Sequence, residues 1–291
     1  IDTLFQYLNY DSQNGFGTDL LGFKSNWYGR LTGPFKDELV PGSFVTKFGF
    51  IGFIFFLIQK KNKLFFYLSV IYLALIGVVG FVSGERMALA QYILGMLLFL
   101  MFFRNFRLLF FLAIILCGLI VFSFYKLHPV YNDYAVIEST HYHQGLTIEK
   151  SYKCPNDKEK ECKKIINVQP KFIEILKNFK SSAYGEIYNL NIKMFLDNPF
   201  TGVGVNNYKY VCENLNIYNK EMQSYNCASH PHNFYLQWLA EAGIVSFFIF
   251  ILYLFYIFIF ILKNNKNYNL KIISLTNIII LFWPLMSTGS L

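Results

Sequence analysis

The sequence predicts an all-α polytopic membrane protein, a transmembrane helix bundle with one large, partly helical loop on one side of the membrane. Of its 291 residues, 54% are hydrophobic and only 15% are charged, which excludes an ordinary soluble domain. Several apolar runs reach the roughly 20 residues that a bilayer requires. The formal net charge is +8, but the basic residues form no patch with interleaved aromatic side chains. We therefore expect membrane embedding and no nucleic-acid partner.

The apolar runs define the expected order of segments along the chain. Membrane helices are predicted at residues 43–59, 64–83, 87–103, 106–125, 233–262 and 270–286. They divide the chain into an outer segment, four membrane helices, a large loop, and two membrane helices with their outer end, at residues 1–42, 43–125, 126–232 and 233–291. The chain begins at Ile1 and ends soon after an apolar run, so we expect a fragment of a longer membrane protein.

Lysine and arginine in the short loops predict the orientation. Cytoplasmic loops are enriched in these residues. Three short loops carry them: Lys60, Lys61 and Lys63, then Arg104 and Arg107, then Lys263, Lys266 and Lys271. These loops alternate consistently along the predicted spans. Residues 1–42, the Ser83–Arg86 turn and the large loop are therefore expected on the opposite side.

The large loop contains four of the five cysteines, and an even number outside the cytoplasm favours disulfides. Three connectivities are possible. We favour Cys154–Cys162 and Cys212–Cys227, because each pair closes a short loop. The second pair would tie a strand-like stretch, residues 205–212, to the approach to the membrane. Zinc is the alternative, although the spacings are not those of CxxC pairs.

The loop also has expected local structure. Residues 169–197 have helical periodicity, and the stretch Asn198–Gly204 then breaks the helix. Its Gly-x-Gly lacks the strand and helix of a nucleotide-binding loop. We interpret it as a tight turn that returns the chain towards the membrane.

A polar stripe marks the return to the membrane, in the stretch Ser229–Gly243. Asn233, Gln237 and Glu241 recur every four residues and so share one helix face. Such side chains are costly against lipid, so the stripe is expected to face protein or a water-filled cavity. Asn233 and Gln237 are candidate substrate-binding residues.

Two histidines precede this stripe. Pro231 suits a first helical turn, which would place His232 in the opening turn. There the helix dipole favours the neutral imidazole that a general base requires. His230 would orient the loop or bind a sugar. The two histidines are too close for a helical metal pair, as are His141 and His143, so we predict no metal and no cofactor.

Arg86 and Arg30 are the candidate anion-binding residues. Arg86 lies in the tight turn between two predicted spans. It is either a snorkelling, structural arginine or a partner for phosphate, which its planar donor fork suits. Arg30 lies just before the first span. Three lysines share its region, so the sequence alone does not single it out: Lys24, Lys36 and Lys47.

Several motifs together resemble one family. HPHNFYLQWLAEAGI at 230–244 is similar to the signature of the O-antigen ligase and O-antigen polymerase superfamily of bacterial membrane glycosyltransferases. Four further stretches resemble landmarks of that superfamily in the same order: RLTGPFKDELVPGSF at 30–44, SGERMALA at 83–90, DNPFTGVGVNNY at 197–208 and STGSL at 287–291. The ordered combination is more specific than any single motif.

The resemblance implies a multi-pass protein of the bacterial inner membrane with its large loop in the periplasm. It implies transfer of a glycan from undecaprenyl diphosphate to a sugar hydroxyl of the lipid A core, with no metal. By position, His232 would be the general base, and Arg86 and Arg30 would hold the diphosphate.

Other functions remain open at this stage. Within the superfamily, the chain could be a polymerase that extends the lipid-linked glycan, or a protein O-oligosaccharyltransferase. A transporter or lipid flippase would favour charged residues within the spans and broken helices at the midplane. A structural membrane protein would explain the helices but not a histidine above a polar stripe.

Overall fold

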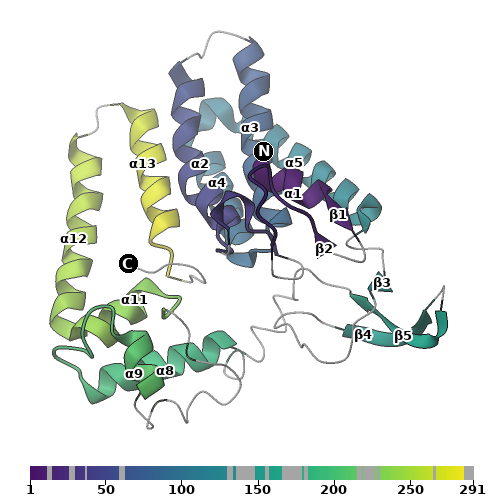
Figure 1. The fold of residues 1–291 in the computed structure, drawn as a ribbon. Coiled ribbons are helices and arrows are strands. Elements are labelled where there is room, and N and C mark those ends of the chain that lie inside the picture. The colour runs from purple at the N-terminus through teal and green to yellow at the C-terminus, as the bar shows by residue number, and fades with distance from the viewer. Residues whose placement is uncertain are drawn as a thin grey trace. The chain divides into compact units, whose positions relative to one another are not determined.

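The computed structural model describes the chain in two compact units, residues Ile1–Lys171 and Phe172–Leu291. In Figure 1 the first runs from purple to teal and the second continues to yellow. Within them, the described residues are 1–11, 15–25, 30–36, 38–58, 63–129, 134–135, 148–154, 157–165, 179, 183–214, 218, 227, 230–264 and 267–284.

Four apolar helices form the body of the first unit: α2 (Pro41–Ile58), α3 (Lys63–Val82), α4 (Arg86–Phe102) and α5 (Arg107–Leu127). Helix α3 packs against the other three. Edge-to-face and tilted aromatic contacts fill the space between α2, α4 and α5, among them Phe53–Phe110, Phe99–Phe110 and Phe50–Phe99. These rings are almost completely buried. The predicted bundle is therefore built on an aromatic core.

Short elements surround these helices in the polar parts of the first unit. Helix α1 (Asp2–Leu8) precedes an antiparallel pair, β1 (Tyr10–Asp11) and β2 (Gly15–Phe16). A 3₁₀ turn, Gly33–Phe35, leads into α2. The loop segment contains a three-stranded antiparallel sheet of order β3-β5-β4, formed by β3 (Tyr134–Ala135), β4 (Ile148–Cys154) and β5 (Asp157–Ile165). The apolar segments are helical, as predicted, and the strands lie in polar sequence.

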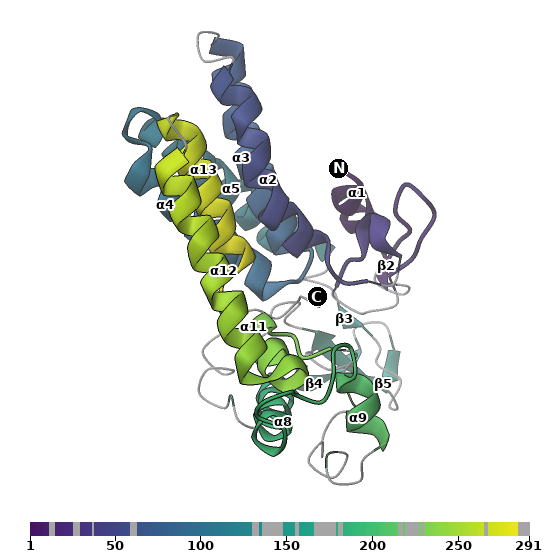
Figure 2. The same ribbon diagram turned by 90° about the vertical axis from the view of Figure 1, so that its left-hand side faces the viewer.

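The second unit also consists mainly of helices: α8 (Ala183–Asp197), α9 (Tyr208–Asn214), α11 (Phe234–Gln237), a π-helical turn (Trp238–Ala242), α12 (Gly243–Asn264) and α13 (Tyr268–Leu281). Helices α11 and α12 are both labelled in Figure 2, and the π-helical turn connects them. Helices α8 and α9 share a buried cluster with the π-helical turn, which contributes Ala240. The predicted helix over 169–197 is confirmed only from Ala183, because residues 169–178 and 180–182 lie outside the described ones.

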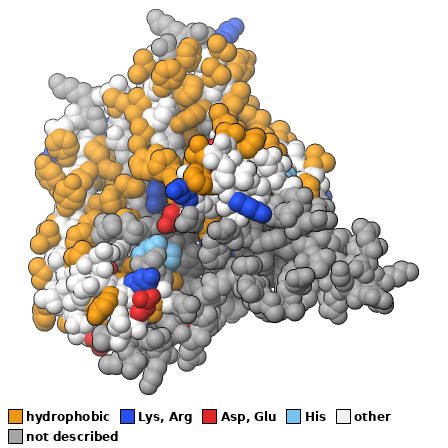
Figure 3. Space-filling view, in the orientation of Figure 1, with side chains coloured by type: hydrophobic (Ala, Val, Ile, Leu, Met, Phe, Trp, Pro, Cys, Tyr) orange, Lys and Arg blue, Asp and Glu red, His pale blue; other side chains and the backbone are white. Residues whose placement is uncertain are grey.

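Four helical segments are long and apolar enough to cross a membrane: Pro41–Ile58, Lys63–Val82, Arg104–Leu127 and Phe234–Asn264. Two apolar helices are shorter, α4 and α13. Helix α13 ends at Leu281 and not at residue 286, since Pro284 disfavours helical backbone in the residue before it. Hydrophobic side chains cover much of the face shown in Figure 3. Exposed side chains on these helices include Phe55, Phe111 and Phe255. This surface is suited to lipid, and the chain is a membrane protein.

Candidate functional site

The histidine segment leads into a helix that Asn233 caps. The Asn233 side-chain oxygen accepts the backbone N–H of Tyr235 at 3.0 Å and of Leu236 at 3.1 Å. These are donors that a helix start leaves without internal partners. The helix therefore begins at Phe234. The expectation that Pro231 and His232 lie inside its first turn is wrong, because the side chain of Asn233 supplies the stronger start signal.

His232 comes immediately before this cap, in a left-handed backbone conformation with φ 58°. Histidine adopts this conformation more readily than bulky or β-branched residues do, but it still carries strain. Its ring centroid lies 4.2 Å from that of His230, with a 55° angle between the ring planes. Both side chains are half-buried. The two predicted histidines therefore form one cluster beside the helix start.

Asn233 also joins the helix start to two other elements. Its amide nitrogen donates to the carbonyl of Pro284 at 2.8 Å and to the hydroxyl of Tyr188, on α8, at 3.3 Å. The residue is 5% exposed, so these bonds lie in a protected environment. Asn233 consequently fixes the position of the residue before it, His232.

The polar stripe is buried against protein, one of the two environments expected for it. Gln237 donates its amide to a carboxylate oxygen of Glu241 at 3.0 Å. The other carboxylate oxygen accepts the backbone N–H of Tyr208 at 3.1 Å, at the start of α9. A negative charge is favourable at a helix N-terminus. Gln237 and Glu241 therefore link the membrane helix to α9.

The stretch Asn198–Gly204 docks on the π-helical turn. Backbone N–H groups of Val203 and Gly204 donate to the carbonyls of Ala240 and Glu241, at 2.8 and 2.9 Å. A π-helical turn frees such carbonyls from the regular ladder. Gly202 has φ 66°, and a Cβ there would come within 2.3 Å of the Glu241 carbonyl carbon. This close approach explains why position 202 is a glycine. The predicted tight turn packs its backbone directly against the backbone of the π-helical turn.

Cys212 and Cys227 form the predicted disulfide, with 5.9 Å between their Cα atoms. It joins α9 to the segment that leads to the histidines. The expectation of a strand over residues 205–212 is wrong, because residues Tyr208–Asn214 are helical. Cys154 and Cys162 lie on β4 and β5, opposite Asp157 and Tyr152 respectively. Their side chains lie outside the described ones, so their disulfide stays a prediction, and His141 and His143 also fall outside.

In the first unit, the Ser83–Arg86 turn is built around Glu85. This side chain is 2% exposed and accepts the backbone N–H of Gly42 at 2.7 Å and of Ser43 at 3.1 Å. The hydroxyl of Ser43 donates to it as well. Glu85 thus caps α2, while Arg86 is the first residue of α4. Sequence reasoning missed this role, since the partners lie about 40 residues away along the chain.

Arg30 belongs to the same region. The backbone N–H of Leu31 donates to the carbonyl of Ser83 at 3.3 Å, which joins the Arg30 segment to the turn. Burial raises the pKa of the Glu85 carboxyl, against the opposing effects of its donors and of the positive charge of Arg30. Lys47 also interacts electrostatically with Glu85. Arg30 and Lys47 therefore both interact with one buried acid, whose neighbour in the sequence is Arg86.

The candidate residues fall into two groups. Arg30 and Arg86 lie in the first unit, and His230, His232, Asn233 and Gln237 lie in the second. Among the described residues, no group of three or more His, Cys, Asp or Glu side chains is arranged to hold a metal ion.

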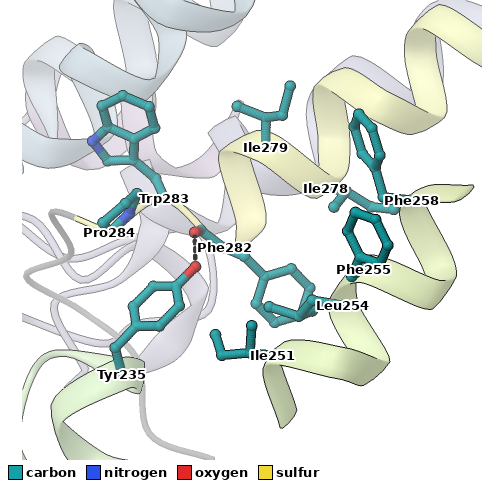
Figure 4. Close-up of a pocket in the computed structure, with 10 residues that line it drawn as sticks. All are labelled: Tyr235, Ile251, Leu254, Phe255, Phe258, Ile278, Ile279, Phe282, Trp283 and Pro284. Atoms are coloured by element: carbon teal, nitrogen blue, oxygen red, sulfur yellow. Dashed lines mark hydrogen bonds between the residues drawn. The ribbon is translucent and has the colours of Figure 1, made fainter. Parts of the chain in front are cut away.

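The second unit also contains an apolar groove of about 420 Å³ between α12 and α13 (Figure 4). It is lined by Tyr235, Ile251, Leu254, Phe255, Phe258, Ile278, Ile279, Phe282, Trp283 and Pro284. The Tyr235 hydroxyl donates to the carbonyl of Phe282 at 2.6 Å, so the helix start is bonded to the end of α13. The groove therefore adjoins the Asn233 cap, which bonds Pro284.

Long apolar helices, a capped histidine segment and an arginine-bearing turn define a class of multi-pass membrane proteins with polar groups placed at the ends of their helices. A sequence model of the O-antigen ligase family matches residues 71–251, more than half of the chain. The chain belongs to this family, which confirms the resemblance seen in the motifs. The matched stretch contains Arg86 and His232, whereas Arg30 precedes it.

No curated protein and no solved structure matches the chain. Family membership implies a transferase that acts on lipid-linked glycans.

Proposed function

We propose that the protein is an O-antigen ligase that moves a glycan from undecaprenyl diphosphate to a sugar hydroxyl of the lipid A core. The observation that carries this function is His232, held directly before the Asn233 cap in a chain of the O-antigen ligase family. The reaction takes place at the periplasmic face of the bacterial inner membrane. The lysine and arginine residues of the short loops support that orientation.

His232 is the general base of the proposed reaction. Its imidazole accepts the proton of the acceptor hydroxyl as that oxygen attacks the anomeric carbon of the glycan. A new glycosidic bond forms, and the bond from the anomeric carbon to the diphosphate oxygen breaks. Attack opposite the leaving group inverts the anomeric configuration. Asn233 keeps His232 in place, which reduces the entropic cost of aligning base and hydroxyl.

Arg86 and Arg30 hold the lipid diphosphate and stabilise its charge as it leaves. A guanidinium can donate two parallel hydrogen bonds to a phosphate, and fixed cations cost no reorganisation during the reaction. Diphosphate is already a good leaving group. Positioned arginines and one base therefore suffice, and the proposed reaction requires no metal. His230 is proposed to contribute to glycan binding beside this base, whereas Asn233 and Gln237, which are buried and bonded within the protein, are proposed to support the helix start from which the glycan site is built.

The acceptor is tested with purified, intact protein. It is given an undecaprenyl-diphosphate-linked glycan together with either lipid A core or a second lipid-linked glycan. Consumption of lipid A core is the expected result. Consumption of the second glycan alone would identify a polymerase, and glycosylation of an added protein acceptor alone would identify an O-oligosaccharyltransferase. A parallel reaction with a chelator tests the metal requirement: activity lost with the chelator and restored by a divalent cation would contradict the mechanism.

A further inference from the structure

Glu85 joins the starts of two membrane helices. It is the residue before α4. The hydrogen bonds described for its carboxylate, however, come from Gly42 and Ser43 of α2. The carboxylate is 2% exposed, where hydrogen bonds are strong and their loss is costly. The first residue of α4, Arg86, is therefore tied to α2 through the side chain of its neighbour.

The Arg30 segment is bonded both to the same turn and to the side chain of Gln6 on α1. Leu31 donates to Ser83, and Gln6 accepts the backbone N–H groups of Thr32 at 3.1 Å and Gly33 at 2.9 Å. Gln6 is completely buried. These bonds hold the two residues that follow Leu31. Both arginine-bearing segments thus end on one turn, Ser83–Glu85.

The contact between α2 and this turn leaves no spare room. A Cβ on Gly42 would come within 2.2 Å of the Ser83 hydroxyl oxygen and 3.1 Å of the Ala88 Cβ. At these distances the Ser83 side chain would have to move and Ala88 would have to shift by a few tenths of an ångström. The Glu85 bonds therefore lie at a tightly packed junction.

The charges at this junction complement one another. Arg30 and Lys47 both interact electrostatically with Glu85. Cations gathered at one place repel each other unless an anion lies among them. Glu85 places a carboxyl among them, and its hydrogen-bond donors at Gly42 and Ser43 together with the charge of Arg30 favour the ionised form against the opposing effect of burial. The cations can then hold their positions before a substrate phosphate arrives.

We infer that Glu85 is a positioning residue for the lipid diphosphate: by bonding α2 to the turn between α3 and α4, it holds in place the turn that precedes Arg86 and that bonds the Arg30 segment. This inference rests on the proposed function, in which those arginines hold the diphosphate. Glu85 itself does not contact the substrate. Its effect is transmitted through the placement of the two arginine segments.

The test measures binding of undecaprenyl diphosphate to purified protein in detergent, with undecaprenyl monophosphate as the comparison ligand. The variant is Glu85→Gln. Removing a negative charge beside two cations should, by Coulomb attraction alone, tighten diphosphate binding. Loss of positioning should instead weaken it. We expect the Kd for the diphosphate to rise about tenfold, as is common for coupled contacting groups, and the preference over monophosphate to fall.

The matched control is Asp19→Asn. Asp19 is also a buried carboxylate of the first unit, 3% exposed, and it accepts the backbone N–H groups of Leu21 and Phe23. Its bonds lie within its own loop and do not join α2 to the turn. The Kd of this variant should equal that of the parent. An equal loss of binding in Asp19→Asn would show a general effect on folding and would overturn the inference.

Arg86→Ala separates failure of the inference from failure of the proposed function. If the parent binds the diphosphate, Arg86→Ala loses binding and Glu85→Gln binds like the parent, the inference alone is wrong. If the parent does not bind the diphosphate, the proposed function is wrong and the inference falls with it. Should Glu85→Gln not fold, Ser43→Ala removes one of the three donors. It must raise the Kd about threefold at unchanged unfolding temperature, and a parental Kd would overturn the inference.

Discussion

Helices α4 and α11 both begin beside a residue with a proposed catalytic role, but their starts are stabilised in opposite ways. At α11, Asn233 caps its own helix, and His232 precedes it. At α4, Glu85 stands at the cap position but bonds α2, and Arg86 follows it. One functional side chain is therefore held by a local bond, and the other by a bond between helices.

This difference determines how a fault at each site should spread. Damage at the Asn233 cap should stay near His232 and the elements that Asn233 touches. Damage at Glu85 should separate elements that are far apart in sequence. Base function should therefore respond to local substitutions, and diphosphate binding should respond to substitutions in α2 as well as in the turn.

The largest effect is expected at His232, the residue before the Asn233 cap. His232→Ala should lower the transfer rate by about 10²- to 10⁴-fold, the usual contribution of a general base. Diphosphate binding should stay parental, because the arginines are unchanged. Transfer assays and binding measurements on the same preparation test both statements. His230→Ala is the control, with a much smaller loss expected. A parental transfer rate for His232→Ala would refute the base assignment.

The second-largest effect is expected at Arg86, the residue that follows Glu85. Arg86→Ala should lower kcat/KM by about 10²- to 10³-fold, comparable to removal of one transition-state donor. Arg86→Lys should recover part of this loss, since lysine keeps the charge but not the donor fork. Arg104 is exposed beyond the other end of α4, and Arg104→Ala serves as the control in the same kinetic assay. Equal losses for Arg86→Ala and Arg104→Ala would contradict a specific role.

The Cys212–Cys227 disulfide affects the two helix starts differently, because it lies in the unit that contains His232 and not in the unit that contains Arg86. Cys212 and Cys227 are 15 residues apart, and breaking such a loop costs about 3 kcal/mol of unfolding free energy. Cys227→Ser should therefore lower the unfolding temperature, as should reductant on the parent. Diphosphate binding should change little. Among the described residues, Cys117 is a free and buried cysteine. The control variant Cys117→Ala should therefore still show a lower unfolding temperature when reductant is added. A parent insensitive to reductant would contradict the prediction.

A smaller effect is expected at the local cap itself. Asn233→Ala removes the cap, which typically costs about 1 kcal/mol, together with the bonds to Pro284 and Tyr188. Asn233→Ser restores a capping oxygen but not those two bonds. Unfolding measurements and transfer rates should rank the parent first, serine second and alanine last. If serine and alanine behaved alike, the cap would not be what holds His232.

The smallest effect is a pH dependence at Glu85. Burial raises the pKa of this carboxyl above its ordinary value of 4.5, so the folded protein binds the proton more tightly than the unfolded chain. The resulting stabilisation is complete below pH 4.5 and is lost as the pH rises towards the higher folded pKa. Unfolding temperatures measured across that range should fall more steeply for the parent than for Glu85→Gln. Identical slopes would show that Glu85 does not titrate in this way.

Much of the fold could be predicted because hydrophobicity and length alone define membrane helices. Each predicted apolar helix is present, with ends that differ by a few residues. The prediction from sequence was wrong where contacts between residues far apart in the chain determine the local structure. Residues 205–212 contain valines and tyrosines, which are common in strands, yet Glu241 caps α9 there and the disulfide anchors it. No local pattern indicates such partners.

The two candidate sites differ in the same respect. The polar stripe that includes Asn233 could be identified from the sequence, because a period of four is a local signal. The cap formed by Asn233 was missed, since Pro231 predicts an earlier helix start. Glu85 could not be identified either, because its donors lie in another helix. The π-helical turn was also missed, since the groups that satisfy its free carbonyls belong to a stretch almost 40 residues earlier, Val203 and Gly204.

The end of that π-helical turn also determines where the long apolar helix begins. Gly243 follows the turn with φ 73° and ψ −178°, a backbone conformation that only glycine adopts readily, so the turn and α12 are not one regular helix. The backbone N–H of the next residue, Ile244, donates to the carbonyl of Pro199 at 2.8 Å. A Cβ on Gly243 would come within 2.2 Å of the carbonyl oxygen of Phe200, so a larger residue here would push the start of α12 away from the segment on which it rests.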